Sequence, residues 1–242
     1  MSRDRIWYTI TQVDSTIRRL KGGIKRSTVA DIVLEYRVYR DSDADQVTDL
    51  LADVFSRHDP LAHAARVTRA EFAGFALSLL PQAAKDGLTI VACMPATGEI
   101  VGVMLTNDGA ADSAAELSES NQKFRPIASI LGELDEIYLA GRKPRPGEML
   151  HLYLLGVSDR VAGHGIGQQL VLRTVEHGAS KGYKIAFAES TNRRSQHIFR
   201  KLGFSERAQI LYGEHVFEGQ NFFAVVAEHG GPLLMEKVLA GA

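Results

Sequence analysis

The residues best suited to chemistry surround a glycine-rich turn in the second half of the chain. Gly163-His164-Gly165-Ile166-Gly167, with Gln168 next, separates an apolar run, 149–157, from an amphipathic segment, 165–180. Glycines in such a turn let successive backbone N–H groups converge on an anion, and the helix N-terminus adds partial positive charge. The turn therefore predicts a pyrophosphate site, with a plain strand-to-helix turn as the alternative.

Two other phosphate-binding motifs do not fit this segment. The Rossmann pattern needs a third glycine at position 168, which is Gln, and it normally follows the first strand of a domain. A P-loop needs Gly-Lys followed by Ser or Thr, and the turn has no such continuation. We therefore do not expect a nucleotide-binding fold of either type.

Two later segments make the interpretation of this turn more specific. They are Glu189-Ser190-Thr191-Asn192 and Phe199-Arg200-Lys201-Leu202-Gly203-Phe204. In this order the sequence resembles the GNAT superfamily of N-acetyltransferases, in which strand four, a glycine loop, strand five and a helix ending in Leu-Gly-Phe follow one another. The resemblance implies an α/β (α+β) fold: a mixed, mostly antiparallel sheet of six to seven strands, flanked by helices, with splayed parallel strands four and five.

The resemblance also implies acetyl-coenzyme A as the cosubstrate, without a metal. The pantetheine arm would lie between segments 149–157 and 183–189, and the pyrophosphate would lie on the amides of 163–168. Ala162 stands where the family usually has Arg or Gln, and Asn192 is also expected to cap a helix. The residues expected to bind the cosubstrate are Leu155, Gly156, Val157, Gly163, His164, Gly165, Ile166, Gly167, Gln168 and Asn192.

The catalytic groups cannot follow the commonest pattern of the family. Its usual acid is a Tyr four residues before the glycine of Leu-Gly-Phe, and here that residue is Phe199. Phe55 and the run His58-Asp59-Pro60-Leu61 resemble a motif of the animal arylalkylamine (dopamine-type) N-acetyltransferases. That resemblance implies a carboxylate, Asp59, acting with two hydroxyls, those of Thr191 and Ser195. The alternatives are a turn-forming Asp59 and hydroxyls that only cap a helix or face solvent.

A second candidate base is His151. It matches a strand-four histidine of the vertebrate melatonin-pathway acetyltransferases, and Tyr153 occupies the position of their second histidine. Imidazole, with an ordinary pKa of about 6.5, is suited to accept a proton at neutral pH. The alternatives are a histidine hydrogen-bonded within the sheet and, for Tyr153, either a proton donor or a core residue.

Composition and charge narrow the class of function. The 242 residues include 28 Lys+Arg and 29 Asp+Glu, a net charge of -1, so no general positive field favours nucleic acid or an anionic membrane. The single cysteine, Cys93, excludes an internal disulfide and a cysteine-rich zinc site, and a cytoplasmic location is expected. No apolar stretch approaches the roughly 20 residues that span a bilayer.

The chain is expected to comprise an N-terminal extension, 1–31, and an acetyltransferase domain, 32–242, with a helical insert, 108–148. The insert has its own apolar helical face and is expected to cover the site. Two strands, 208–213 and 221–227, and a short final helix should complete the domain. The extension is predicted to form an amphipathic helix that packs on the domain, or alternatively forms a homodimer, from the spacing of Ile6, Ile10, Val13, Ile17 and Leu20.

The sequence therefore predicts an enzyme that transfers the acetyl group of acetyl-CoA to a primary amine. Direct attack with help from a general base is expected, and the acceptor is expected to be a small molecule, an arylalkylamine or a polyamine. Two alternatives stay open. One is acetylation of a protein N-terminus or lysine, and the other is an acyl-CoA-binding module without turnover, suggested by Ala162 and Phe199.

Overall fold

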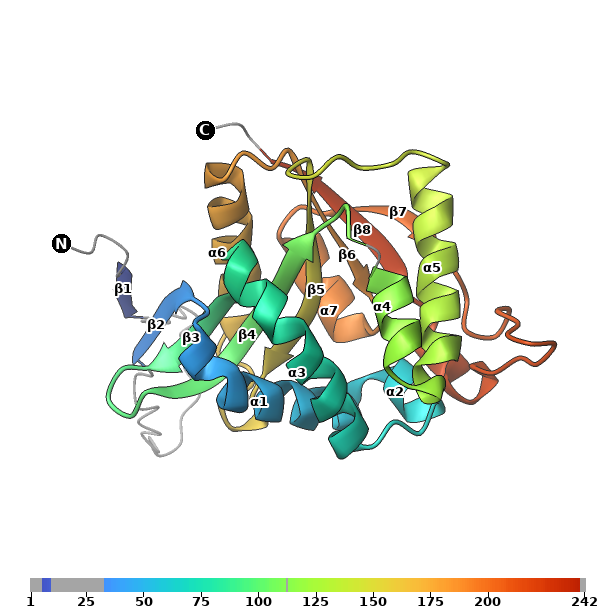
Figure 1. The fold of residues 1–242 in the computed structure, drawn as a ribbon, viewed down its shortest axis with the longest axis horizontal. Helices are drawn as coiled ribbons and strands as arrows, with labels where there is room; N and C mark the ends of the chain where they lie inside the picture. Colours follow the sequence, from blue (N-terminus) through green and yellow to red (C-terminus); the bar gives the residue numbers. More distant parts are fainter. Residues whose placement is uncertain (1–5, 10–32, 112, 240–242) are drawn as a thin grey trace, which may run out of the picture.

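The computed structural model describes residues 6–9, 33–111 and 113–239. Within them, one eight-stranded sheet has the order β1-β2-β3-β4-β5-β6-β8-β7 (Figure 1). All neighbouring strands are antiparallel except the parallel pair β5 and β6, as the mixed sheet of the prediction requires. The strands are β1 Ile6–Thr9, β2 Val33–Val38, β3 Ile90–Met94, β4 Glu99–Asp108, β5 Met149–Val157, β6 Ile185–Ser190, β7 Ser205–Gln209 and β8 Leu233–Val238.

Helices cover both faces of this sheet. One face carries α1, α3 and α5, and the opposite face carries α6 and α7 (Figure 1). No helix in the described part of the chain is both long enough and apolar enough to cross a bilayer. The α-helices are α1 Ala44–His58, α2 Pro60–Ala64, α3 Arg69–Asp86, α4 Ser113–Ser120, α5 Arg125–Leu139, α6 Ile166–Ser180 and α7 Arg193–Lys201. Short 3₁₀ helices are η1 Asp41–Asp43, η2 Gln122–Phe124, η3 Asp159–Val161 and η4 Ala224–His229.

Strand β5 is apolar along nearly its whole length because both of its faces are covered. Met149 and Leu154 belong to the core beneath α1, α3 and α5, whereas Leu150 and Leu152 belong to the core beneath α6 and α7. A continuous apolar run is typical of a strand buried on both sides. The central position of β5 places its carboxyl end beside the glycine turn that begins α6.

The parallel strands β5 and β6 pair only near their start. Register partners run from Met149 with Ile185 to His151 with Phe187, and none follows. Beyond this point β5 remains paired with β4, and β6 remains paired with β8 as far as Ser190. The two strands therefore diverge toward their carboxyl ends, which confirms the predicted splay.

The predicted helix in residues 1–31 falls mostly outside the described residues. The described part, Ile6–Thr9, forms strand β1, which pairs antiparallel with β2. For these four residues the helix prediction is wrong, since they add an edge strand. This strand brings the sheet to one strand more than the six to seven expected.

The end of the chain differs from the prediction. Segment 221–227 is not a strand: η4 covers Ala224–His229, and the buried residues Phe223 and Val226 stand three apart, the period of a 3₁₀ helix. The first of the two predicted strands lies earlier, at β7. The final segment is strand β8 and not a helix, because it fills the place between β6 and β7 and buries Leu233, Leu234 and Met235.

Candidate active site

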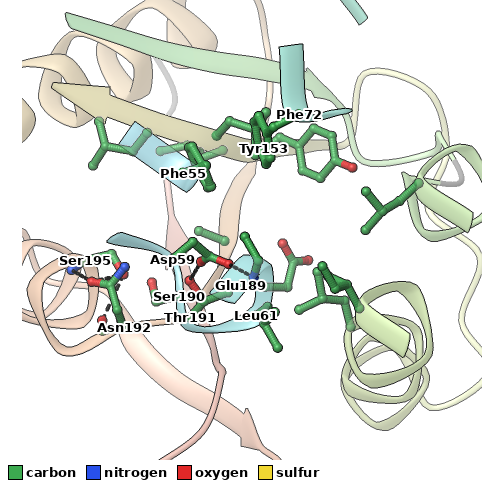
Figure 2. Close-up of a pocket in the computed structure, with 18 of the residues that line it drawn as sticks. Phe55, Asp59, Leu61, Phe72, Tyr153, Glu189, Ser190, Thr191, Asn192 and Ser195 are labelled. Carbon is green, nitrogen blue, oxygen red and sulfur yellow. Dashed lines mark hydrogen bonds between the residues drawn. The ribbon is translucent and has the colours of Figure 1, made fainter. Parts of the chain in front are cut away.

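An apolar pocket of about 90 Å³ lies where β5 and β6 diverge. Figure 2 shows Phe55 and Tyr153 on one side of it and Asp59 and Glu189 facing them from the other. Its aromatic wall consists of Phe55, Phe72, Phe75, Phe124 and Tyr153, and its polar residues are Asp59, Glu189, Ser190, Thr191, Asn192 and Ser195. Carboxyl and hydroxyl groups thus share a cavity with aromatic rings.

Four separate parts of the chain build the aromatic wall, and Tyr153 is the contribution of β5. Phe55 comes from the last turn of α1 and stacks on Phe72 of α3, with ring centroids 4.8 Å apart. Phe124 comes from the insert, and its ring centroid lies 5.1 Å from that of Phe75. The insert also contributes Leu117, Ile127 and Leu131 to the lining, so it covers the pocket as expected from its apolar face.

Asp59 lies in the break between α1 and α2 and is buried. Its Oδ1 accepts a hydrogen bond from the backbone N–H of Ala62 at 2.8 Å, which caps α2. Its Oδ2 accepts a hydrogen bond from Thr191 Oγ1 at 2.5 Å. Burial raises the pKa of the Asp59 carboxyl, although hydrogen bonds from Thr191 and from the amides of Ala62 and Leu61 act in the opposite direction. Asp59 therefore forms the predicted turn and also presents a carboxyl group to the pocket.

Thr191 and Ser195 both line the pocket, at the start of α7. Asn192 caps this helix, and its Oδ1 accepts from the N–H groups of Arg194 and Ser195 at 3.0 Å each. Ser195 Oγ donates to the Asn192 carbonyl at 2.9 Å. The cap fixes the turn between the two hydroxyls, which brings Asp59, Thr191 and Ser195 to one cavity.

His151 is not among the residues that line this pocket. It is buried, its Nε2 lies 2.6 Å from Glu189 Oε2, and its ring stacks on Phe187 with centroids 4.5 Å apart. His151 is thus hydrogen-bonded, as in the alternative that was considered, and its role as a base stays a prediction. His151 lines a second cavity, on the side of the insert.

Glu189 is the pocket residue that sequence reasoning did not select. Burial on its own would raise the pKa of its carboxyl, but the charge of His151 and hydrogen bonds from His151 and Asp135 outweigh burial, so the pKa is lowered. The available signal was its place two residues before Thr191 on a strand, since alternate side chains point to the same face.

The glycine turn has the conformation that an anion site needs. Gly163 and Gly165 have φ angles of 83° and 74°, in the left-handed region that favours glycine. No side chain caps the N-terminus of α6, so its first amides remain available to a ligand. His164 directs Nδ1 at the loop carbonyls of Val161 and Ala162, at 3.2 and 3.1 Å. Ile166, Gly167 and Gln168 form the first turn of α6, so this segment can present backbone amides to an anion.

The remaining predicted cosubstrate residues lie on the free edge of β5. Leu155 lines the pocket. From Leu152 to Val157 the edge toward β6 has no strand partner among the described residues, so backbone groups there can pair with amides of a ligand. Gly156 permits close packing of α1, because a Cβ at this position would lie 3.1 Å from Leu51 Cδ2.

Comparison with known proteins gives two findings. The acetyltransferase (GNAT) family profile matches residues 35–204. Among solved structures, arylalkylamine N-acetyltransferase 2 from Aedes aegypti is 23% identical with a TM-score of 0.72, covering 86% of this chain and 99% of that chain. The Drosophila melanogaster polyamine N-acetyltransferase, which catalyses formation of N-acetylagmatine, is 19% identical with a TM-score of 0.69, covering 85% and 100%. These structures share the fold, and the family profile, which spans more than half of the sequence, shows that the chain belongs to the acetyltransferase (GNAT) family.

Proposed function

We propose that this protein transfers an acetyl group from acetyl-CoA to the primary amine of a small molecule, an arylalkylamine or a polyamine. One observation carries the proposal: the buried carboxyl of Asp59, held by Thr191, faces an aromatic pocket at the point where β5 and β6 diverge. Membership of an acetyltransferase family and the fold shared with amine acetyltransferases support it.

Residues on the two sides of the gap between β5 and β6 have different roles in the proposed reaction. Acetyl-CoA, when bound, supplies an acetyl group activated as a thioester, and the turn 163–168 and the free edge of β5 would hold it. Asp59 accepts a proton from the ammonium group of the acceptor, directly or through one water, and leaves the amine free to attack. Its raised pKa makes it a stronger proton acceptor than an exposed aspartate. Thr191 orients the carboxyl. As the C–S bond breaks, Ser195 passes to the departing sulfur the proton that the nitrogen loses when the amide forms.

An assay of free thiol release with acetyl-CoA tests the proposal. We expect release that depends on the amine across a panel of phenylethylamines, linear monoamines and linear diamines. Equilibrium binding of CoA is measured in parallel. Tight CoA binding without amine-dependent thiol release would overturn the proposal and support a binding module without turnover.

A second candidate acceptor is a lysine side chain or N-terminus of a protein. The observation in its favour is a cavity of about 830 Å³ that shares Phe75 and Tyr153 with the aromatic pocket. Its lining includes the carboxyl groups of Glu71, Asp86, Asp108 and Glu119, of which Glu71 is paired with Lys123 at 2.8 Å. Basic peptides included in the same assay separate the two candidates, since higher kcat/KM for peptides than for every small amine would select the protein acceptor.

A further inference from the structure

Glu189 is a second acidic residue in the aromatic pocket that contains Asp59. Its side chain is 5% exposed, and it lines the same cavity as Asp59 (Figure 2). Glu189 lies at the end of β6, two residues before Thr191, the residue that holds Asp59, so the Cα atoms of Glu189 and Thr191 are about 7 Å apart where the chain is extended. The pocket thus has a carboxyl group at each of two separate positions.

The groups around Glu189 give this part of the pocket an excess of acidic groups. Glu189 Oε2 lies 2.6 Å from His151 Nε2, and the Asp135 carboxyl also forms a hydrogen bond with Glu189. Two carboxyl groups thus share one imidazole, and no Lys or Arg in the described part of the chain forms an ion pair with Glu189. Burying carboxyl groups without a matching number of cations is costly, so a cationic ligand gains free energy by reaching them.

The groups that face this cluster come from several elements. Asp135 lies on α5, Glu189 on β6 and His151 on β5, while Ser113 of α4 lies 3.4 Å from His151 Nδ1. The ring of Tyr153 lies 4.9 Å from that of His151, and Tyr153 lines the pocket. An aromatic face beside a carboxylate is a favourable environment for an ammonium or guanidinium group.

The small volume of the pocket favours a slender acceptor. Its volume of about 90 Å³ is smaller than the cavity of roughly 150 Å³ that admits benzene in a protein core. With bonds of about 1.5 Å, two nitrogens joined by four methylenes in an extended chain lie roughly 6 Å apart. Such a chain separates the amine that reacts beside Asp59 from a second cation that Glu189 can bind.

We infer that Glu189, held by His151 and Asp135, binds the second cationic group of a linear diamine or guanidino-amine whose first amine is acetylated beside Asp59. This inference rests on the proposed function and makes it more specific. Glu189 is then a specificity-determining residue, and the aromatic wall encloses the methylene chain between the two nitrogens.

The test compares 1,4-diaminobutane with butylamine, which has the same carbon chain and one cation fewer. For the unmodified protein we expect kcat/KM to be about 10- to 100-fold higher for the diamine, the effect of one charge-assisted contact. Glu189→Gln should abolish this preference, so that the ratio of kcat/KM for the diamine to that for butylamine falls to about one. The Gln side chain keeps an acceptor for His151, and Glu176→Gln, an exposed position on α6, is the matched control.

Thermal unfolding and CoA binding check that each variant is folded. If Glu189→Gln fails to fold, Asp135→Asn replaces it, with a reduced preference for the diamine expected. Equal kcat/KM for the two amines in the unmodified protein would overturn the inference. An equal loss for both amines in the Glu189 variant would also overturn it, since that result indicates a structural role. If no amine supports thiol release, the proposed function itself fails, and this outcome is distinct from the other two.

Discussion

Asp59 is the residue on which the proposed chemistry depends. Replacing it with Asn keeps an acceptor oxygen for the Ala62 N–H and removes the charge. We expect Asp59→Asn to lower kcat/KM by about 10²- to 10⁴-fold, the usual contribution of a general base, with CoA affinity unchanged. His151→Ala is the comparison, since it alters the other candidate base. If His151→Ala removes the rise of kcat/KM with pH and Asp59→Asn does not, Asp59 is not the base.

The same substitution changes stability in a way that depends on pH. Burial raises the pKa of Asp59 in the folded protein, so the folded state binds this proton more tightly than the unfolded state. Stability is then lost as pH rises from the unfolded pKa of about 3.9 through the higher folded value. Asp59→Asn should therefore gain thermal stability relative to the unmodified protein near neutral pH and lose that advantage in acid. A difference in Tm that stays constant from acidic to neutral pH would contradict this expectation.

Thr191 affects the pKa of the Asp59 carboxyl group through one hydrogen bond. Its Oγ1 donates to Asp59 Oδ2, which favours the ionised form and lowers the pKa of Asp59. In Thr191→Val that contribution is lost, so we expect the rise of kcat/KM to move to higher pH. Thr191→Ser, which keeps the hydroxyl, should retain the original pH profile. Unchanged profiles in both variants would show that Thr191 does not act through Asp59.

At the scale of single elements, the glycine turn before α6 is the part most open to a direct test. Gly165 has a φ of 74°, and an added Cβ there would meet no atom within 4 Å. Gly165→Ala therefore acts through the backbone, at a cost of about 1–2 kcal/mol, and should shift the amides that face the pyrophosphate. We expect CoA affinity to fall by about 10-fold or more, since each 1.4 kcal/mol corresponds to a factor of ten.

A matched control exists at the other end of the same helix. Gly182 has a φ of 96° and equally open surroundings, but it follows α6 instead of preceding it. Gly182→Ala should lose stability to a similar extent and keep CoA affinity, as measured by calorimetry. Equal losses of affinity in both variants would show that the effect is global and not local to the turn.

At the scale of the whole molecule, positive and negative charges nearly balance, but they are not evenly distributed over the structure. The net charge is -1, yet the larger cavity beside the aromatic pocket is lined by four carboxyl groups. Such a surface attracts cations, and salt screens the attraction beyond roughly 8 Å at physiological ionic strength. We expect added NaCl to lower kcat/KM for a diamine more than for a monoamine. Parallel salt dependences for the two amines would contradict this expectation.

Much of the fold was predictable because local patterns carry it. The apolar run 149–157, the glycines of 163–167 and the Asn192 cap are short-range signals, and β5, α6 and α7 lie where these signals place them. The prediction of a strand at 221–227 is wrong because the composition of this segment suits a strand, whereas tertiary packing buries only its residues Phe223 and Val226. Strand β8 was missed because its partners, β6 and β7, are both distant in sequence.

The candidate site divides in the same way. The sequence by itself determined the glycine turn and the cap, since both depend on residue type and spacing, whereas Asp59, Thr191 and Ser195 became candidates through the resemblance to a subgroup of the family. Only the tertiary structure decided that Thr191 donates a hydrogen bond to Asp59, 132 positions away. It also decided that His151 contacts Glu189 and does not line the pocket. The physical reason is that hydrogen bonds between distant segments depend on how the strands splay and how the insert packs, and no local pattern of residues specifies either.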